Sequence, residues 1–434
     1  MRKIIISWLV AAAALLGCAG PAFAETWTTG TAGSDAVALN AASALDDASA
    51  LGRLVAARAQ VSVHGFFLGN GNAVSCGTVT ACLSVGMTTV TGKSPDFKPT
   101  AARWHAGTWT PVPVETPKEA SLTVLNGVSC KVTYCLVAGE SVIYSAIGFD
   151  IRPYMLSWNG TSLTPITPPP VPKADAFGEL LDVSCAAPEK CVAIGAGEPR
   201  AGHGVVEYVW TLNGTTWGLT AVRFPGAGNF TQYTGLHCFS LTSCVAIGAS
   251  ADPTNQRGET LLAASWNGKR FTDLKAPLPS GMSGAVFTGL SCSAPRSCAA
   301  VGTGQSGASG ARTVGFAEVW DGKTWAVTKW AGPAGDTEAA LTGVSCPVPE
   351  RCIAVGTHGT DETLAPAALA LGGSKWTVLA VPGPGNGTAS VFDGVSCPLN
   401  GQCVATGETG KVNAFKSAPL AGRWNGRAWT YGPM

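Results

Sequence analysis

Short apolar runs and polar turns follow one another along most of the chain in a fixed order. The apolar run Gly394-Val395-Ser396-Cys397 is followed, after a polar turn, by Cys403-Val404-Ala405, and later by the turn Trp424-Asn425-Gly426. Asn-Gly between aromatic and β-branched residues is a strong hairpin signal, because both turn positions need a positive φ. Each such unit therefore predicts four short strands, two flanking the cysteine turn and two flanking the tryptophan turn.

Cysteine positions show that this order is repeated. After Cys18, the remaining cysteines fall into seven local pairs, whose first members lie 51–55 residues apart. The pairs are Cys76 with Cys82, Cys130 with Cys135, Cys185 with Cys191, Cys238 with Cys244, Cys292 with Cys298, Cys346 with Cys352, and Cys397 with Cys403. The spacing predicts a repeat protein made of seven similar units.

Four strands in a unit of this length are typical of one β-propeller blade. We therefore expect an all-β fold, a seven-bladed β-propeller with four antiparallel strands and one disulfide per blade. The segment from Asp35 to Gln60 is rich in Ala and Leu and predicts a short N-terminal helix. The predicted organisation is a signal peptide at 1–24, a helical segment at 25–69 and the propeller at 70–434.

The repeated pattern also resembles a known group of proteins. S-C-x5-C-x-A-V-G followed by W-N-G-x-x-W is similar to the blade motif of secreted bacterial repeat proteins of the actinobacterial type, which are expected to be β-propellers. The turn Trp320-Asp321-Gly322-Lys323-Thr324-Trp325 distantly resembles the Asp-box hairpin of sialidase-type propellers, without its Asp-x-Gly spacing, and kelch blades are a further distant likeness. The resemblance implies a fold and export, and it implies no particular activity.

The N-terminus has the pattern of an export signal. Arg2 and Lys3 precede an apolar run from Ile4 to Leu16, and Pro21-Ala22-Phe23-Ala24 ends in an A-x-A cleavage pattern. Leu15-Leu16-Gly17-Cys18 offers an alternative, because it resembles a bacterial lipobox in which Cys18 would be lipidated. Both interpretations predict an extracytoplasmic protein, either freely secreted or anchored at the cell envelope.

Composition and charge restrict the partners. The sequence has 28 Lys and Arg against 27 Asp and Glu, and 46% hydrophobic residues. A nearly neutral chain has no basic surface for nucleic acid or anionic membranes, and no later stretch is long and apolar enough to span a membrane. We expect a monomer that binds an extracellular or envelope protein or glycan.

The repeated residues predict structure rather than chemistry. Local cysteine pairs across a hairpin predict disulfides in an oxidising compartment, and C-x5-C is not a zinc spacing, so neither a metal nor a cofactor is expected. The tryptophans are expected to pack between blades, with sugar stacking as the alternative. His237 departs from the pattern, because the other six units have Ser before the first cysteine.

Candidate ligand-binding residues come from the loops. Alternating strand directions put the cysteine hairpins and tryptophan turns on one face, so the other face collects the variable loops and the connections between units. The candidates there are Asp150, Arg152, Tyr154, Arg200, His203, Tyr233, Arg257, His358 and Asp361, with Asp336 on a connection. No catalytic residue is assigned.

The sequence predicts an exported propeller scaffold that binds a protein or glycan through this variable-loop face or at the channel mouth. The alternative is a lectin or a glycan-active enzyme of the sialidase-like hydrolase class, because Phe149-Asp150-Ile151-Arg152-Pro153 faintly resembles an arginine motif of that class. Four loop arginines could serve such a site, but the remaining catalytic residues are not recognisable. The sequence makes an enzyme the less favoured interpretation.

Overall fold

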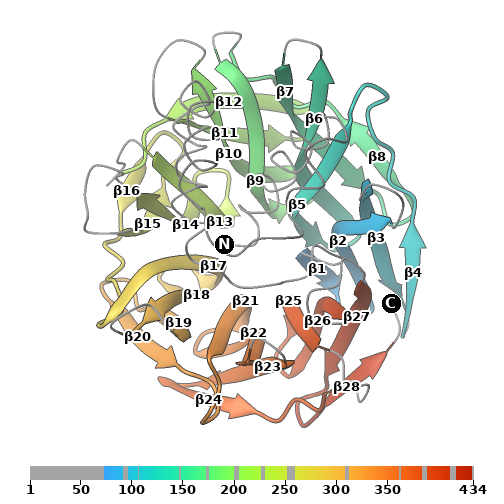
Figure 1. Ribbon diagram of the computed structural model, residues 1–434. Helices are drawn as coiled ribbons and strands as arrows, with labels where there is room; N and C mark the ends of the chain where they lie inside the picture. The colour runs from blue at the N-terminus through green and yellow to red at the C-terminus, as the bar shows by residue number, and fades with distance from the viewer. Residues whose placement is uncertain are drawn as a thin grey trace, which may run out of the picture.

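The computed structural model describes residues 73–432 apart from short gaps at 91–95, 106, 146–147, 173–174, 200–204, 226–229, 252–259, 308–311, 361–362, 384–388 and 411–416. The regular structure in these residues is entirely β-strand (Figure 1). The first strands in the chain are β1 (Ala73–Thr78), β2 (Ala81–Val90), β3 (Asp96–His105), β4 (Thr108–Val112), β5 (Leu122–Lys131), β6 (Tyr134–Ser145), β7 (Gly148–Trp158), β8 (Leu163–Ile166), β9 (Asp175–Ala187), β10 (Lys190–Pro199), β11 (Val206–Asn213) and β12 (Thr216–Val222). The later strands are β13 (Phe230–Ser240), β14 (Ser243–Ala251), β15 (Thr260–Trp266), β16 (Phe271–Asp273), β17 (Met282–Ala294), β18 (Ser297–Ser306), β19 (Arg312–Trp320), β20 (Trp325–Trp330), β21 (Glu338–Val348), β22 (Arg351–Thr360), β23 (Thr363–Gly372), β24 (Lys375–Leu379), β25 (Ala389–Leu399), β26 (Gln402–Gly410), β27 (Ser417–Trp424) and β28 (Trp429–Gly432).

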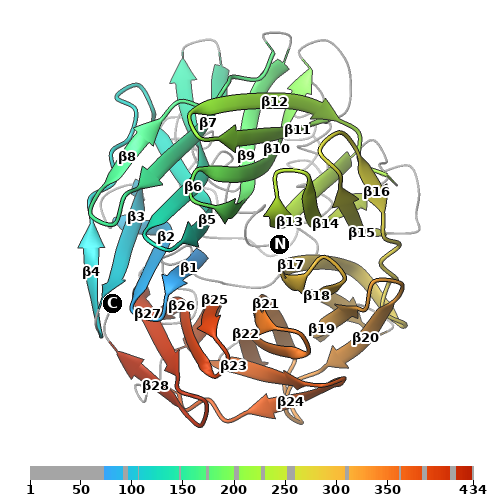
Figure 2. The same cartoon turned by 180° about the vertical axis from the view of Figure 1, so that it is seen from behind.

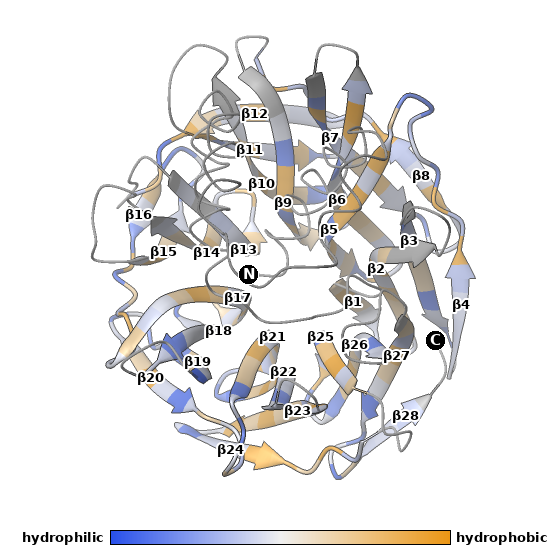
Figure 3. Ribbon diagram, viewed as in Figure 1, coloured by the Kyte–Doolittle hydropathy of each residue, from blue (hydrophilic) through white to orange (hydrophobic). Residues whose placement is uncertain are grey.

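Neighbouring strands pair in chain order, so each sequence repeat folds as an antiparallel meander. The sheet β1-β2-β3-β4 is typical, and the same order holds in the sheets that begin at β5, β9, β13 and β25. The cysteine turn joins the first two strands of a repeat and the tryptophan turn joins the last two. Hydropathy colouring places apolar segments in the strands of all the sheets (Figure 3).

The first strands of the repeats surround the centre of the molecule. Each contacts the first strand of the next repeat, in the order β1, β5, β9, β13, β17, β21 and β25, and β25 contacts β1. The sheets therefore form a closed ring around a central axis, as both opposite views show (Figures 1 and 2). This arrangement of repeated antiparallel sheets is a β-propeller.

The prediction of seven four-stranded blades with a short N-terminal helix is wrong as stated. Hydrogen bonding divides the strands into six sheets, of which five are four-stranded blades and one is an eight-stranded sheet that contains β17 to β24. The two repeats merge because Thr313 of β19 pairs in parallel with Glu338 of β21. No helix occurs in the described residues, and the predicted helical segment at 25–69 lies outside them.

Two connecting interactions explain the merged sheet. The Thr313 amide donates to the carbonyl of Thr337 at 3.0 Å, and Nε of Arg312 donates to the carbonyl of Asp336 at 2.9 Å. These bonds hold the connection into β21 against the edge of β19. One repeat therefore continues into the next through main-chain pairing, which its cysteine and tryptophan pattern did not indicate.

Seven disulfides close the cysteine hairpins, and each lies within one repeat. They join Cys76 to Cys82, Cys130 to Cys135, Cys185 to Cys191, Cys238 to Cys244, Cys292 to Cys298, Cys346 to Cys352, and Cys397 to Cys403. The partners lie 3.9–4.1 Å apart between Cα atoms. This is the local pairing that the cysteine spacing predicted.

The tryptophans of the turns contribute to the apolar core of the sheets. Several of them are buried, and Trp320 packs against Trp325 as Trp424 packs against Trp429. Both pairs belong to larger clusters of buried side chains from neighbouring repeats. The tryptophan turn therefore stabilises the outer part of each repeat, as the disulfide stabilises the inner part.

Candidate functional site

A polar cavity of about 410 Å³ lies at the centre of the ring. The first strands of all seven repeats line it, each through the residues just before its first cysteine. The cavity therefore occupies the half of the channel nearest the cysteine hairpins. Its volume is within the range of roughly 300–1,000 Å³ that is typical of small-molecule sites.

Alternation along the first strands arranges the lining in levels. Residues two apart on a strand face the same side, so the positions three before, one before and one after the first cysteine form three levels about 7 Å apart. The level nearest the hairpins contains Lys131, the middle level contains the serines and His237, and the third contains Asp182 among glycines. We call the middle level the serine circle.

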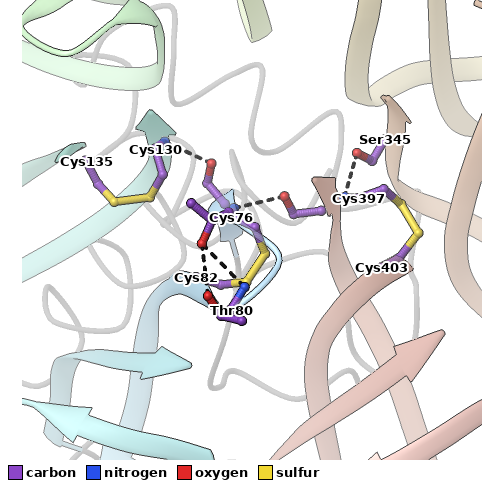
Figure 4. Close-up of a disulfide and its surroundings, with 11 residues drawn as sticks. Cys76, Thr80, Cys82, Cys130, Cys135, Ser345, Cys397 and Cys403 are labelled. Carbon is purple, nitrogen blue, oxygen red and sulfur yellow. Dashed lines mark hydrogen bonds between the residues drawn. A yellow bond between two sulfur atoms is a disulfide. The ribbon is translucent and has the colours of Figure 1, made fainter. Parts of the chain in front are cut away.

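Six serines link each repeat to the next. In each case the backbone N–H of a first cysteine donates to the Oγ of the serine in the preceding repeat, at 2.8–3.0 Å. The serines of the circle are Ser75, Ser129, Ser184, Ser291, Ser345 and Ser396. Figure 4 shows three of these bonds, including the one from Cys76 to Ser396 that joins the first repeat to the last.

The disulfides stand at the wall of the cavity. The first cysteines Cys76, Cys130, Cys346 and Cys397 are among its lining residues. In the described part of the chain, the second cysteine of each repeat lies behind this wall and does not line the cavity, namely Cys82, Cys135, Cys191, Cys244, Cys298, Cys352 and Cys403. Because the sulfurs are bonded to one another, they hold the wall in place and offer no thiolate to a ligand or metal.

A second set of bonds lies farther from the hairpins. The hydroxyls of Thr288 and Thr342 each donate to a carbonyl of the next repeat at 2.7 Å. Thr234 donates in the same way at 3.1 Å, and Nδ2 of Asn126 donates at 2.7 Å. Side chains therefore hold neighbouring first strands together although these strands do not pair through their backbones.

Glycines allow these strands to approach closely. A Cβ on Gly289 would lie 3.1 Å from the Cα of Gly343, and a Cβ on Gly343 would lie 3.2 Å from the Cα of Gly394. At the same level, Asp182 accepts from the amide of Leu236 in the next repeat at 2.8 Å. Its other oxygen accepts from the amide of Val183 at 2.9 Å, so both carboxylate oxygens are held by backbone donors.

His237 interrupts the serine circle. It stands where the serine of the fourth repeat would accept from the amide of Cys292, and no serine bond is formed at that junction. Burial, together with the positive charge of Lys131, lowers the pKa of His237 to about 4. The imidazole is therefore neutral at pH 7, and its ring packs against Phe239 with centroids 5.2 Å apart.

Lys131 is the charged residue of the level nearest the hairpins. It lines the cavity, it is partly buried, and burial lowers its pKa. Among the described residues it has no salt-bridge or hydrogen-bond partner. The neighbouring lining residues Gly77 and Pro398 at this level are uncharged.

The cavity offers hydrogen-bond donors to a ligand. Each serine Oγ of the circle accepts from a backbone amide, and its own proton has no acceptor among the described residues. A hydroxyl is both a donor and an acceptor, so six O–H groups remain available to a bound molecule. The arrangement can therefore bind a ligand with many oxygen atoms. In the described part of the chain, no group of three or more metal-ligating side chains is found.

The residues predicted from the sequence as a binding site lie elsewhere. Asp150 and Arg152 are brought together on β7, where Nε of Arg152 lies 2.8 Å from Oδ2 of Asp150 and its guanidinium 3.8 Å from Glu119. Tyr154 is buried and its hydroxyl donates to the carbonyl of Glu115. Burial raises the pKa of Tyr154 to about 12, with a further contribution from the charge of Glu115.

Two other predicted residues have structural surroundings. Tyr233 is buried on β13 and stacks on Phe224 with centroids 3.4 Å apart, and burial strongly raises its pKa. Nδ1 of His358 lies 2.7 Å from Oδ2 of Asp336, on the connection that joins the two repeats of the eight-stranded sheet. Arg200, His203, Arg257 and Asp361, and with them Cys18, lie outside the described residues.

Sequence reasoning missed the cavity, although its lining was visible in the pattern. The Gly and Ser before the first cysteines were interpreted as structural because they recur in most repeats. Recurrence in a ring has a second meaning: it places the same side chain many times around one axis. The substitution at His237 and the single lysine at Lys131 were the signals of an uneven channel.

No protein-family model and no curated protein matches the sequence. Solved structures resemble the fold at low identity. The β-propeller domain of the Trilobed protease from Pyrococcus furiosus has 7% identity and a TM-score of 0.46, over 85% of this chain and 98% of that one. YCF48 bound to D1 peptide has 12% identity and a TM-score of 0.45, over 83% and 95% of the two chains. The polysaccharide lyase Uly1 has 9% identity and a TM-score of 0.47, over 84% and 91%.

Proposed function

We propose that this chain is an exported binding protein whose central cavity holds a glycan. The observation that carries the proposal is the serine circle, in which six hydroxyl groups on a rigid ring have protons available for a ligand. A sugar offers oxygen acceptors in several directions, and a ring of hydroxyls can meet them from several sides. An apolar ligand would leave these donors without partners, which costs binding energy.

The rigidity of the ring supports binding rather than catalysis. The lining strands are held by side-chain bonds between repeats and by a disulfide next to each serine. A preformed site loses little conformational entropy when it binds, so its hydrogen bonds contribute more of their energy to affinity. Binding of a small glycan end group fits a cavity of about 410 Å³.

The cysteines support a location outside the cytoplasm. Seven disulfides suggest an oxidising, extracytoplasmic environment. None of the described residues forms a helix that could cross a bilayer. The signal peptide at 1–24, lipidation of Cys18 and the likeness to secreted actinobacterial repeat proteins remain predictions from the sequence.

The proposal is tested by closing the cavity. His237→Trp is expected to fill the channel without removing a serine bond, because none of the six serine bonds involves His237. Isothermal titration with the methyl glycosides of glucose, galactose and mannose is expected to show binding of at least one of them to the unmodified protein. Binding should be lost in His237→Trp and kept in His105→Trp, a matched change at an exposed position of a tryptophan turn.

Two results would contradict this function. The first is the absence of binding by any of these glycosides and their acidic forms. The second is unchanged binding after His237→Trp in a protein whose circular dichroism and melting temperature are normal. The second result would favour the variable-loop face predicted from the sequence, where Asp150 and Arg152 form an exposed ion pair.

A glycan-active hydrolase is the second candidate, and one observation favours it. Asp182 and Asp393 both line the cavity, and paired carboxyl groups are the catalytic residues of most glycosidases. The bonds from two backbone amides to Asp182 oppose this role, because they occupy the oxygens that a nucleophile or base would use. Release of reducing sugar from oligosaccharides, abolished by Asp393→Asn, would establish the hydrolase.

A further inference from the structure

We propose that the ligand of the central cavity is an acidic sugar that carries one carboxylate, bound with that carboxylate at Lys131. This inference rests on the proposed function and names its substrate class. It is carried by the position of a single cation at one end of a ring of hydroxyl donors. Three features of the lining lead to it.

The first feature is the unpaired lysine. Lys131 lines the cavity and is partly buried, and among the described residues no carboxylate lies within ion-pair distance of it. A buried charge is normally paired, because its removal from water costs free energy. A ligand carboxylate would supply the missing partner and form a charge-assisted hydrogen bond.

The second feature is the order of charges along the axis. Lys131 lies one residue after its cysteine and Asp182 lies three before, so they are two levels and about 13 Å apart along the channel. Asp393 is one residue farther from the hairpins than the level of Asp182. A molecule in the cavity is therefore directed with its negative end toward the hairpins and its hydroxyl groups among the serines.

The third feature is the number of positive charges. At the level of Lys131 the other lining residues are uncharged, and His237 is neutral at pH 7 because burial lowers its pKa. Among the described residues, no arginine lines the cavity. One lysine balances one carboxylate, whereas phosphate and other multiply charged groups are generally held by several cations or by the bidentate contacts of arginine.

His237 distinguishes this junction from the other six. The amide of Cys292 has no serine to which it can donate, since His237 occupies that place. The middle level of the cavity is therefore uneven, with one neutral imidazole among six hydroxyl groups.

The test compares each methyl glycoside with its matched C6 acid, namely methyl glucuronide, galacturonide and mannuronide, by isothermal titration at pH 7. The unmodified protein is expected to bind an acid about tenfold or more tightly than its neutral counterpart, as a charge-assisted bond predicts. Lys131→Met should remove this preference while neutral sugar still binds. Lys131→Arg should keep most of it.

A lysine on a neighbouring hairpin provides the control. Lys190 is exposed and does not line the cavity, so Lys190→Met should leave both affinities unchanged. Equal affinity for acid and neutral sugar, or a preference that survives Lys131→Met, would overturn the acidic ligand and leave the glycan site standing. Failure of every sugar to bind the unmodified protein would instead overturn the proposed function, and this inference with it.

Discussion

His237 shows, at the scale of single residues, what the serine at this position does. In the other six repeats a hydroxyl accepts from the cysteine amide of the next repeat, so a backbone donor at the junction is satisfied. At His237 that bond is absent. This repeat junction therefore lacks the serine bond that the other six have.

Replacing His237 by the repeat's usual residue should strengthen this junction. In His237→Ser the new Oγ is expected to accept from the amide of Cys292, as its equivalents do, and to raise the free energy of unfolding by about 1 kcal/mol. Urea denaturation measures the change. His105→Ser, at an exposed position, should give no gain, and a loss of stability in His237→Ser would show that the imidazole itself supports the fold.

The same residue predicts how stability depends on pH. Burial lowers the pKa of His237 from 6.5 to about 4, so between these values the unfolded chain binds a proton that the folded chain does not. The contribution of the neutral imidazole to the free energy of unfolding is fully present above about pH 6.5. It decreases as the pH falls toward 4, by up to about 1.4 kcal/mol per pH unit. The difference between the unmodified protein and His237→Ser, measured from pH 4 to 8, should show this slope, and a constant difference would contradict it.

At the scale of strands, β19 contains a carboxyl group that the fold does not pair. Glu318 is fully buried, and neither of its side-chain oxygens has a hydrogen-bond partner in the described residues. Burial raises the pKa of Glu318 to about 8. The folded protein therefore keeps a proton there at pH values at which the unfolded chain has released it.

This proton makes Glu318 a source of instability at higher pH. The contribution of the protonated Glu318 to the free energy of unfolding is fully present below about pH 4.5 and is lost as the pH rises to about 8. The loss over this range amounts to a few kcal/mol. Glu318→Gln, which does not ionise, is expected to become more stable than the unmodified protein as the pH rises from 5 to 8. Urea denaturation at these pH values tests this, with the exposed Glu350→Gln as control; parallel pH profiles would contradict the prediction.

The tryptophan turns give an element-scale prediction of their own. Oδ1 of Asp321 accepts from the amides of Lys323 and Thr324 at 2.7 and 2.8 Å, and Asn425 makes the same two bonds in the last repeat. The amides of Thr324 and Lys323 hold the pKa of Asp321 below its ordinary value. Because Asn425 makes these bonds without a charge, Asp321→Asn should lower the melting temperature less than Asp321→Ala, and equal effects of both would show that the charge, not the turn geometry, matters.

At the scale of the whole molecule, one junction differs from the rest. Neighbouring repeats are joined by the chain, but the described strands β1 and β25 meet without a direct chain connection between them, and the bond from Cys76 to Ser396 spans the seam. Ser396→Ala and Ser345→Ala each remove one equivalent bond. Hydrogen exchange measured by mass spectrometry should show faster exchange of residues 73–78 in Ser396→Ala than of residues 389–399 in Ser345→Ala, and equal exchange would mean that the seam is no weaker than the other junctions.

The sequence was sufficient for the repeat, the hairpins and the disulfides, because these depend on neighbours within one unit. Asn-Gly and Asp-Gly turns fix the hairpin, and cysteines across it must pair locally. The merging of two sheets was not predictable, since it depends on Arg312, Thr313 and Asp336 meeting across a connection. The cavity was missed for the same reason: a serine that looks structural in one repeat becomes a lining residue only when seven repeats close around an axis.

The glycines of the channel have a consequence for how this protein can change over generations. Because neighbouring first strands lie close together there, a Cβ on Gly289 or Gly343 would crowd the backbone of the next strand, and these glycines keep the strands near the axis. The position one before the first cysteine carries His237 in the fourth repeat, and the position one after it carries Lys131 in the second, so larger side chains are accommodated at these two lining sites. Descendants of this chain can therefore acquire new ligand preferences through single codon changes in one repeat, while the other six preserve the scaffold.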